Sequence, residues 1–302
     1  MTTPQFLVVG AARAGTTALQ NYLQQHPQLF LSPQKEPCFF CFVDEELRYK
    51  KGKFSFAVTD VKKYSRLFKD AKPGQVTGEI STPYLYLHNQ TIHNIKKYHP
   101  HPDTLKIIII LRNPVERAYS QYLWKVRDGR EELSFENALK QEKKRMEQNY
   151  SFDYFYSHRG LYFEQVKNYL ENFKNVKIIL FEDFKSTFEN TMSDLCTFLK
   201  VDNTFEFIRK HNINSSSFPR FRTLGKIITV ESKIKFKLLN YIPADLRSGI
   251  KENFNRWNSS SKFPLPIAAA TRIYLEEYYK VDISKLQALL AIDLSSWLNQ
   301  QA

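Results

Sequence analysis

Short strand-like runs alternate along the chain with longer segments in which apolar residues recur every three or four positions. The runs are Phe6–Val9, Gln75–Glu79, Ile107–Leu111 and Val176–Phe181. Runs of this length are typical of strands buried on both faces of a parallel sheet, and the periodic segments are typical of amphipathic helices. The alternation predicts an α/β fold with a central parallel β-sheet and helices on both faces, which makes three layers.

Local signals mark where several helices begin. Asn113 is a favourable N-cap and Pro114 suits the first helical position, so a helix is expected from Pro114 toward Gly129. Ser134, with Glu136 in the following turn, opens a second helix. Residues 267–298 are expected to be mostly helical, with core positions at Ile273, Leu286, Leu289 and Leu290.

The length and composition of the chain limit its organisation. It has 302 residues, of which 42% are hydrophobic, enough for one large core or at most two small domains. No Pro/Gly/Ser-rich linker, low-complexity stretch or internal repeat divides the sequence. A single domain over residues 1–302 is therefore expected.

The chain is strongly basic, with a formal net charge of +13 and a sequence pI near 9.4. A basic surface attracts nucleic acids, acidic membranes, acidic glycans or phosphorylated cofactors, or simply keeps a protein soluble. The basic residues form no long tail, so no nucleic-acid partner is expected. No apolar run reaches the ~20 residues of a spanning helix, and a strand begins soon after Met1, so we expect no membrane span and a cytoplasmic location.

The three cysteines favour neither a redox centre nor a metal centre. Cys38 and Cys41 form a C-x-x-C, but no second pair and no further ligands at finger-like spacing accompany it. Buried, reduced thiols explain this apolar stretch, and the sparse cysteine content, with Cys196 as the third, fits a reducing compartment. No metal site is predicted.

A glycine loop follows the first predicted strand and leads into a helix. Residues 10–17 read G-A-A-R-A-G-T-T. A strand, a glycine loop and a helix N-terminus form a phosphate cradle, because successive backbone N–H groups point at one anion. The glycines match the G-x-x-x-x-G-K-[ST] pattern of P-loop triphosphatases, but Thr16 replaces the lysine and Arg13 is the only charge in the loop. The fold class is therefore predicted as P-loop-type.

The Ile-rich strand ends in a second candidate anion ligand. A triphosphatase strand of this kind often ends in an aspartate that helps to hold magnesium, whereas this strand ends in Arg112. Ser120 follows two helical turns later, so the guanidinium and the hydroxyl can face the same phosphate. The replacement favours a nucleotide with an additional phosphate and no obligatory metal over ATP-type phosphoryl transfer.

These motifs resemble those of sulfotransferases that use 3′-phosphoadenosine 5′-phosphosulfate (PAPS), and most closely those of the heparan-sulfate-type and related bacterial members. Residues 10–17 resemble the 5′-phosphosulfate loop of the family, and residues 111–120 (LRNPVERAYS) resemble its 3′-phosphate motif. Similar segments follow in the same order along nearly the whole chain, at residues 35–40 (KEPCFF), 78–84 (GEISTPY), 159–162 (RGLY) and 293–298 (DLSSWL).

The resemblance implies transfer of a sulfuryl group from PAPS to a hydroxyl or amine of an acceptor, without an obligatory metal. A carbohydrate is the favoured acceptor, and a small natural product is the alternative. Donor contacts are implied for residues of the two phosphate motifs and two positions beyond them, namely Arg13, Ala14, Gly15, Thr16, Thr17, Arg112, Ser120, Tyr162 and Arg220.

Two features depart from the family pattern. Many members carry a lysine in the first loop where this chain has Arg13, which keeps the charge. The glycan enzymes of the secretory pathway often have a disulfide near a C-terminal 3′-phosphate loop, but no cysteine follows Cys196 here. Residues 214–222 are expected to take the place of that loop, with Arg220 and Arg222 as candidate ligands.

The acceptor needs a base to take its proton. Glu36 and Glu79 are the candidates, and the resemblance points to both; we favour Glu36, because Glu79 can instead orient the loop or bind the acceptor. Arg13 is the expected stabiliser of charge on the leaving 5′-phosphate. His99 and His101 compete for the role of base, but their proline-rich surroundings indicate a loop.

Two other classes of protein compete with this interpretation. A P-loop nucleotide kinase is opposed by Thr16 in the lysine position and by Arg112 at the strand end. A non-catalytic basic protein that binds nucleic acid or an acidic glycan would explain the net charge, but it would not explain two phosphate motifs.

Overall fold

The computed structural model describes residues 3–52, 54–209, 218–219, 259–260 and 266–298. At its centre lies a fully parallel five-stranded sheet with the order β2-β3-β1-β4-β5. The strands are β1 (Phe6–Gly10), β2 (Leu29–Leu31), β3 (Val76–Ile80), β4 (Lys106–Leu111) and β5 (Asn175–Leu180). Four of them confirm the predicted runs. The edge strand β2 escaped prediction because three residues are too few to show a pattern.

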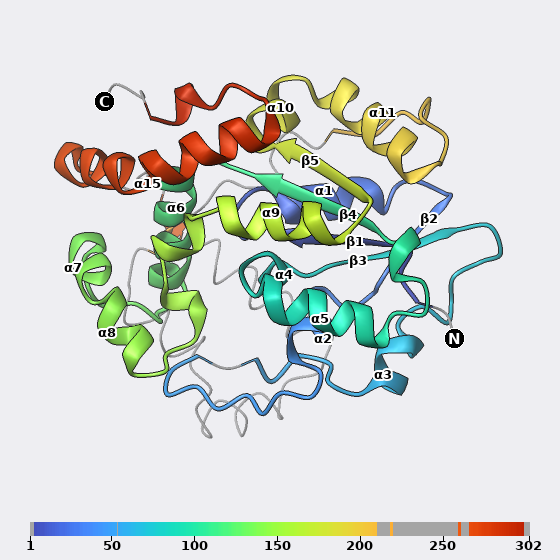
Figure 1. Ribbon diagram of the computed structural model, residues 1–302, viewed down its shortest axis with the longest axis horizontal. Coiled ribbons are helices and arrows are strands. Elements are labelled where there is room, and N and C mark those ends of the chain that lie inside the picture. The colour runs from blue at the N-terminus through green and yellow to red at the C-terminus, as the bar shows by residue number, and fades with distance from the viewer. Residues whose placement is uncertain (1–2, 53, 210–217, 220–258, 261–265, 299–302) are drawn as a thin grey trace.

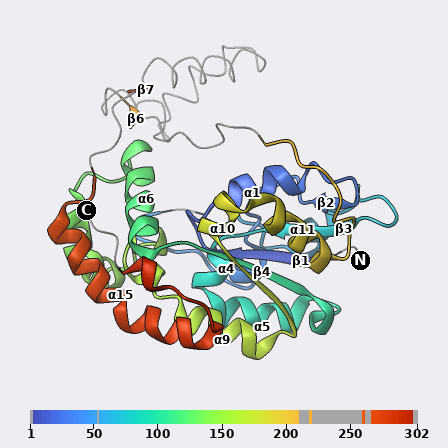
Figure 2. The ribbon, with the colours of Figure 1, turned by 90° about the horizontal axis from the view of Figure 1, so that it is seen from above.

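Helices cover both faces of the sheet (Figures 1 and 2). On one face lie α1 (Thr16–Leu23), α10 (Phe181–Ser186) and α11 (Phe188–Leu199). On the other face lie α4 (Pro83–Tyr86), α5 (His88–Tyr98) and α9 (Phe163–Asn172). The predicted three-layer α/β fold is therefore confirmed.

The remaining elements surround this core. They are α2 (Phe39–Phe42), α3 (Val61–Arg66), α6 (Pro114–Arg127), α7 (Phe135–Lys140), α8 (Glu142–Glu147), α15 (Ala269–Leu290), the two-residue antiparallel strands β6 (Phe218–Pro219) and β7 (Ser259–Ser260), and the short 3₁₀ turns η1 (Pro102–Thr104), η2 (Phe152–Tyr154), η3 (His158–Gly160) and η4 (Ser295–Trp297).

The predicted helix starts are confirmed at atomic level. The Asn113 side chain accepts hydrogen bonds from the backbone N–H groups of Val115 and Glu116 at the start of α6. Ser134 caps α7 by accepting from the N–H of Asn137. Because β4 is buried from Ile107 to Leu111 and Asn113 follows it almost immediately, the cap fixes the direction in which α6 leaves the carboxyl end of the sheet.

The core of α15 differs in part from the prediction. Leu286 is buried as expected, but Ile273 is 66% exposed and Leu289 is 37% exposed. The helix buries the stripe that Leu275, Tyr279, Ile283 and Leu286 form at spacings of three and four residues. Ile273 lies on the opposite side of the helix from that stripe, and Leu289 lies at its edge, next to the last residue of the helix. The expectation for Ile273 and Leu289 was therefore wrong.

Within the described ranges, none of the helices combines the length and apolarity that crossing a membrane requires.

Candidate active site

The glycine loop joins the carboxyl end of the central strand β1 to α1. Gly15 is the N-cap of α1, with a φ of 90° that suits glycine, and a Cβ there would lie 2.9 Å from the Phe181 ring. Arg13 also has a positive φ, of 71°. This bend leaves the N-terminal N–H groups of α1 directed at the open end of the sheet, where an anion can bind.

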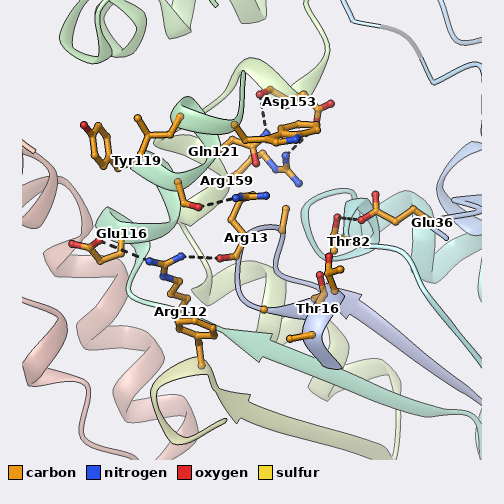
Figure 3. Close-up of a pocket in the computed structure, with 18 of the residues that line it drawn as sticks. Arg13, Thr16, Glu36, Thr82, Arg112, Glu116, Tyr119, Gln121, Asp153 and Arg159 are labelled. Carbon is orange, nitrogen blue, oxygen red and sulfur yellow. Dashed lines mark hydrogen bonds and ion pairs between the residues drawn. The ribbon is translucent and has the colours of Figure 1, made fainter. Parts of the chain in front are cut away.

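The two arginines of the phosphate motifs meet at this loop (Figure 3). The Arg13 guanidinium donates from Nε to the Ser120 hydroxyl at 3.1 Å, and Arg112 donates to the Arg13 backbone carbonyl, also at 3.1 Å. The Arg112 guanidinium lies 5.0 Å from the centre of the Phe181 ring. The Glu116 carboxylate lies 3.9 Å from the Arg112 guanidinium and binds Arg272 more closely, at 2.6 Å. The predicted ligands Arg13, Arg112 and Ser120 are thus brought together.

The space in front of the loop is a cavity of about 1140 Å³. Its lining includes Gly15, Thr16 and Thr17 of the predicted cradle. The cationic side chains on its walls are Arg13, Lys35, Arg112, Arg127, Arg130, Arg159, Lys185, Arg209 and Arg272, whereas the carboxylates are Glu36, Glu116 and Asp153. Burial, together with the neighbouring guanidinium groups of Arg127 and Arg112, lowers the pKa of Arg13 to about 10. An anion in this cavity relieves that repulsion.

Two predicted donor ligands lie behind the cavity wall. Ala14 is fully buried within the loop. Tyr162 is also buried, its hydroxyl donates to the Arg112 backbone carbonyl at 3.1 Å, and its ring meets the Trp297 ring edge-on. Tyr162 therefore supports the backbone of Arg112 from beneath. Arg220 and Arg222, the other candidates, lie outside the described residues.

Glu36 lies on the cavity wall, between β2 and α2. Its Oε1 accepts a hydrogen bond from the Thr82 hydroxyl at 3.1 Å (Figure 3). Burial raises the pKa of Glu36, whereas Lys35 and the Thr82 hydroxyl lower it. A half-buried carboxylate with one hydrogen-bond partner and an open side can accept a proton from a molecule in the cavity.

Glu79 lies at the carboxyl end of β3 but does not reach the cavity. The residue is 1% exposed, and its carboxylate accepts from the hydroxyls of Tyr64 at 2.9 Å, Tyr84 at 2.6 Å and Ser81 at 3.3 Å. Burial raises the pKa of Glu79 to about 7 against the effect of these three hydroxyls.

Two of the hydroxyls that bind Glu79 also accept hydrogen bonds from the segment that follows Glu36. Ser81 Oγ accepts from the backbone N–H of Cys38 at 3.0 Å, and the Tyr84 hydroxyl accepts from the N–H of Phe40 at 3.1 Å. Glu79 thus holds the start of α2 through two relays. Cys38 and Cys41 are buried free thiols in this segment, as predicted.

The histidine alternatives lie far from the cavity. His99 Nε2 forms a 2.7 Å hydrogen bond with the carbonyl of Pro4, just before β1, whereas the glycine loop follows the other end of that strand. His101 bonds through its backbone N–H to His99 at 3.1 Å. In the part of the chain that the structure describes, no group of three or more His, Cys, Asp or Glu side chains is arranged to hold a metal ion.

Sequence reasoning missed several side chains of the cavity. Asp153 bridges Lys125, at 3.3 Å, and Arg159, at 3.2 Å. Lys35 donates to the Thr17 hydroxyl at 2.6 Å. The position of Lys35 beside Glu36 in a motif was a usable signal. Asp153 lies in an aromatic stretch without a motif and carried none.

Comparison with known proteins identifies the class of this fold and site. The sulfotransferase domain family matches residues 3–233, which is most of the chain, so the chain belongs to the sulfotransferase domain family. A solved sulfotransferase from Alicyclobacillus acidocaldarius is 30% identical, with a TM-score of 0.75, over 99% of this chain and 100% of that one.

Curated relatives match a shorter stretch. The membrane-associated sulfotransferase kil1 of Dictyostelium discoideum is 31% identical over 39% of this chain and 22% of its own length. Mouse heparan sulfate glucosamine 3-O-sulfotransferase 6 is 34% identical over 39% of this chain and 30% of its own length. The matched stretches therefore span less than a third of these relatives.

Proposed function

We propose that this protein transfers a sulfuryl group from PAPS to a hydroxyl or amine of an acceptor. The observation that carries the proposal is the convergence of Arg13 and Arg112, from the ends of adjacent central strands, on one cavity that also contains a helix N-terminus. Family membership supports the reaction class. When bound, PAPS supplies the sulfuryl group, whose bond to the 5′-phosphate oxygen breaks as the bond to the acceptor forms.

The donor half of the cavity, which consists of Arg13, Gly15–Thr17, Arg112 and Ser120, fits a nucleotide with two separate phosphates. In this proposal the N-terminus of α1 and Arg13 hold the 5′-phosphate, and Arg112 with Ser120 holds the 3′-phosphate. None of these residues is a carboxylate, so the donor set suits a polyanion. As charge grows on the leaving phosphate, the fixed positive groups stabilise it more strongly.

The acceptor half, which consists of Glu36, Thr82, Asp153 and Arg159, supplies the base. Glu36 takes the proton of the acceptor hydroxyl or amine, and Thr82 holds its carboxylate in place. Glu79 acts as a positioning residue, because its hydroxyl relays fix the segment that carries Glu36.

A carbohydrate is the proposed acceptor. The cavity is large and combines cations with the aromatic side chains Phe54, Phe56 and Trp124, which suits a polar molecule with flat apolar faces. Four curated relatives, two from mouse and two from human, carry heparan sulfate glucosamine in their names. A small natural product with a hydroxyl group is the alternative acceptor.

Calorimetry with adenosine 3′,5′-bisphosphate (PAP), 5′-AMP and 3′-AMP tests the donor assignment. We expect PAP to bind about ten- to a hundredfold more tightly than 5′-AMP, because charged hydrogen bonds to the 3′-phosphate contribute roughly 1.5–3 kcal/mol. Binding without added magnesium is expected, whereas a nucleotide kinase would need it. Equal affinity for PAP and 5′-AMP would remove the basis of the proposal. Sulfate transfer from radiolabelled PAPS to a panel of glycans and phenols then identifies the acceptor class.

A further inference from the structure

Lys35 is one of the cavity cations that the mechanism described above does not use. Lys35 lies on the segment between β2 and α2, and its Nζ donates to the Thr17 hydroxyl at 2.6 Å. Thr17 is the second residue of α1, directly after Thr16, which occupies the position of the lysine in nucleotide triphosphatase loops. An ammonium group therefore reaches the same helix N-terminus from a different part of the chain.

The segment that carries Lys35 is fixed on both sides. The backbone N–H of Ser32 donates to the Gly78 carbonyl at 2.9 Å, and the N–H of Glu36 donates to the Ile80 carbonyl at 3.2 Å. Both carbonyls belong to β3, so hydrogen bonds to this strand set the position of the backbone around Lys35. Within the described ranges Lys35 forms no ion pair with a carboxylate.

A structural role does not explain this contact. Lys35 is exposed, and a single hydrogen bond between an exposed lysine and a hydroxyl contributes little to stability, since water can replace either partner. The neighbouring Glu36 directs its carboxylate to Thr82 instead. The ammonium group thus adds positive charge at the mouth of a phosphate cradle that already contains Arg13.

We propose that Lys35 is a second cationic ligand of the donor's 5′-phosphate and takes over the function of the missing loop lysine. The inference rests on the proposed function and assigns a residue to its donor half. Lys35 releases Thr17 and donates to a phosphate oxygen at the N-terminus of α1, from the side opposite to Arg13. Because it lies next to Glu36 in the chain, it also ties the leaving group to the segment that carries the base.

A binding cycle tests this assignment without measuring turnover. The affinities of wild type and Lys35→Met are measured by calorimetry for PAP and for 3′-AMP, which lacks the 5′-phosphate. We expect Lys35→Met to weaken PAP binding about tenfold, at the low end for a charged hydrogen bond because the site is open to solvent, and to leave 3′-AMP binding unchanged. Lys35→Arg should restore most of the loss, since it keeps the charge.

Matched controls separate the possible outcomes. Lys69→Met removes an exposed lysine that does not line the cavity and should change neither affinity. Arg112→Ala should weaken both nucleotides, since both carry the 3′-phosphate. If Lys35→Met weakens PAP and 3′-AMP equally, or weakens neither, the inference is wrong while the proposed function stands. If wild type binds neither nucleotide, the proposed function itself fails. A melting temperature within about 2 °C of wild type shows that the variant is folded.

Discussion

The donor half and the acceptor half of the cavity are built in different ways. On the donor side, Arg13 and Arg112 follow the ends of adjacent strands, β1 and β4. Arg112 donates a hydrogen bond to the Arg13 carbonyl, and Arg13 donates one to the Ser120 hydroxyl. On the acceptor side, Glu36 comes from a loop, and Asp153 and Arg159 come from two neighbouring 3₁₀ turns much later in the sequence. Parallel strands bring their carboxyl ends together by topology, whereas the positions of loop residues depend on the individual hydrogen bonds and packing contacts around them. The donor half is therefore the more constrained of the two.

The largest expected effect lies in the acceptor half. Glu36→Gln keeps the shape of the side chain but removes the proton acceptor, so sulfate transfer should fall by ~10²–10⁴-fold. Calorimetry should show unchanged PAP affinity, because Glu36 is not a donor ligand. Glu79→Gln is the matched control, and it should lose much less activity. Near-normal transfer by Glu36→Gln would contradict the assignment of the base.

The donor half should respond in turnover and binding together. Arg13→Ala should lower turnover about a hundredfold and PAP affinity by less, since the value of Arg13 grows with the charge on the leaving phosphate. Arg13→Lys keeps the charge and should recover most of the rate. Single-turnover kinetics with radiolabelled PAPS separate the two effects. Equal losses in affinity and rate would mean that Arg13 only binds the donor and does not stabilise the charge on the leaving phosphate.

Arg112 and Ser120, the proposed ligands of the 3′-phosphate, should affect the selectivity between nucleotides more than the rate of transfer. Arg112→Ala should reduce the preference for PAP over 5′-AMP by about ten- to a hundredfold, and Ser120→Ala should reduce it less, because a neutral hydrogen bond contributes less than a charged one. Calorimetry with both nucleotides gives the ratio. An unchanged ratio in Arg112→Ala would place the 3′-phosphate elsewhere.

The pH dependence of the reaction tests the contact between the two halves. Burial raises the pKa of Glu36, and Lys35 opposes that rise; Thr82 and Arg159 also lower the pKa, whereas Asp153 raises it. The acidic limb of kcat/KM should therefore lie above the ordinary carboxyl value. Lys35→Met should move the limb to still higher pH, since Glu36 then protonates more readily. A limb that stays in place would show that Lys35 does not act on the base.

The smallest expected effect concerns stability. The pKa of Glu79 is about 7 in the folded protein against an ordinary value of 4.5, so the folded state binds more protons between these values. Wild type should lose stability as pH rises through this window, and Glu79→Gln should lack that loss. The difference in Tm between wild type and Glu79→Gln should fall as pH rises. A constant difference would show that the carboxylate does not titrate there.

The donor half was largely predictable from sequence, and the acceptor half was not. Gly15, Arg13 and Arg112 lie in two contiguous motifs next to strong strand signals, so local pattern was enough to group them. The partnership of Asp153 with Arg159 depends on aromatic packing around η2 and η3, which local pattern does not encode. The sequence favoured Glu36 over Glu79 but could not show the hydroxyls of Tyr64 and Tyr84, which only the fold brings to Glu79.

The contact between Asn113 and Trp297 has a consequence for the order of assembly. The amide of Asn113 donates to the Trp297 carbonyl at 3.1 Å across 184 positions of sequence, and the Trp297 ring packs on Tyr162 beneath Arg112. A ribosome makes the glycine loop and the Ile-rich strand long before it makes Trp297. The support of Arg112 is therefore complete only late in synthesis, and a nascent chain should acquire its full affinity for nucleotide bisphosphates only after this late segment has emerged.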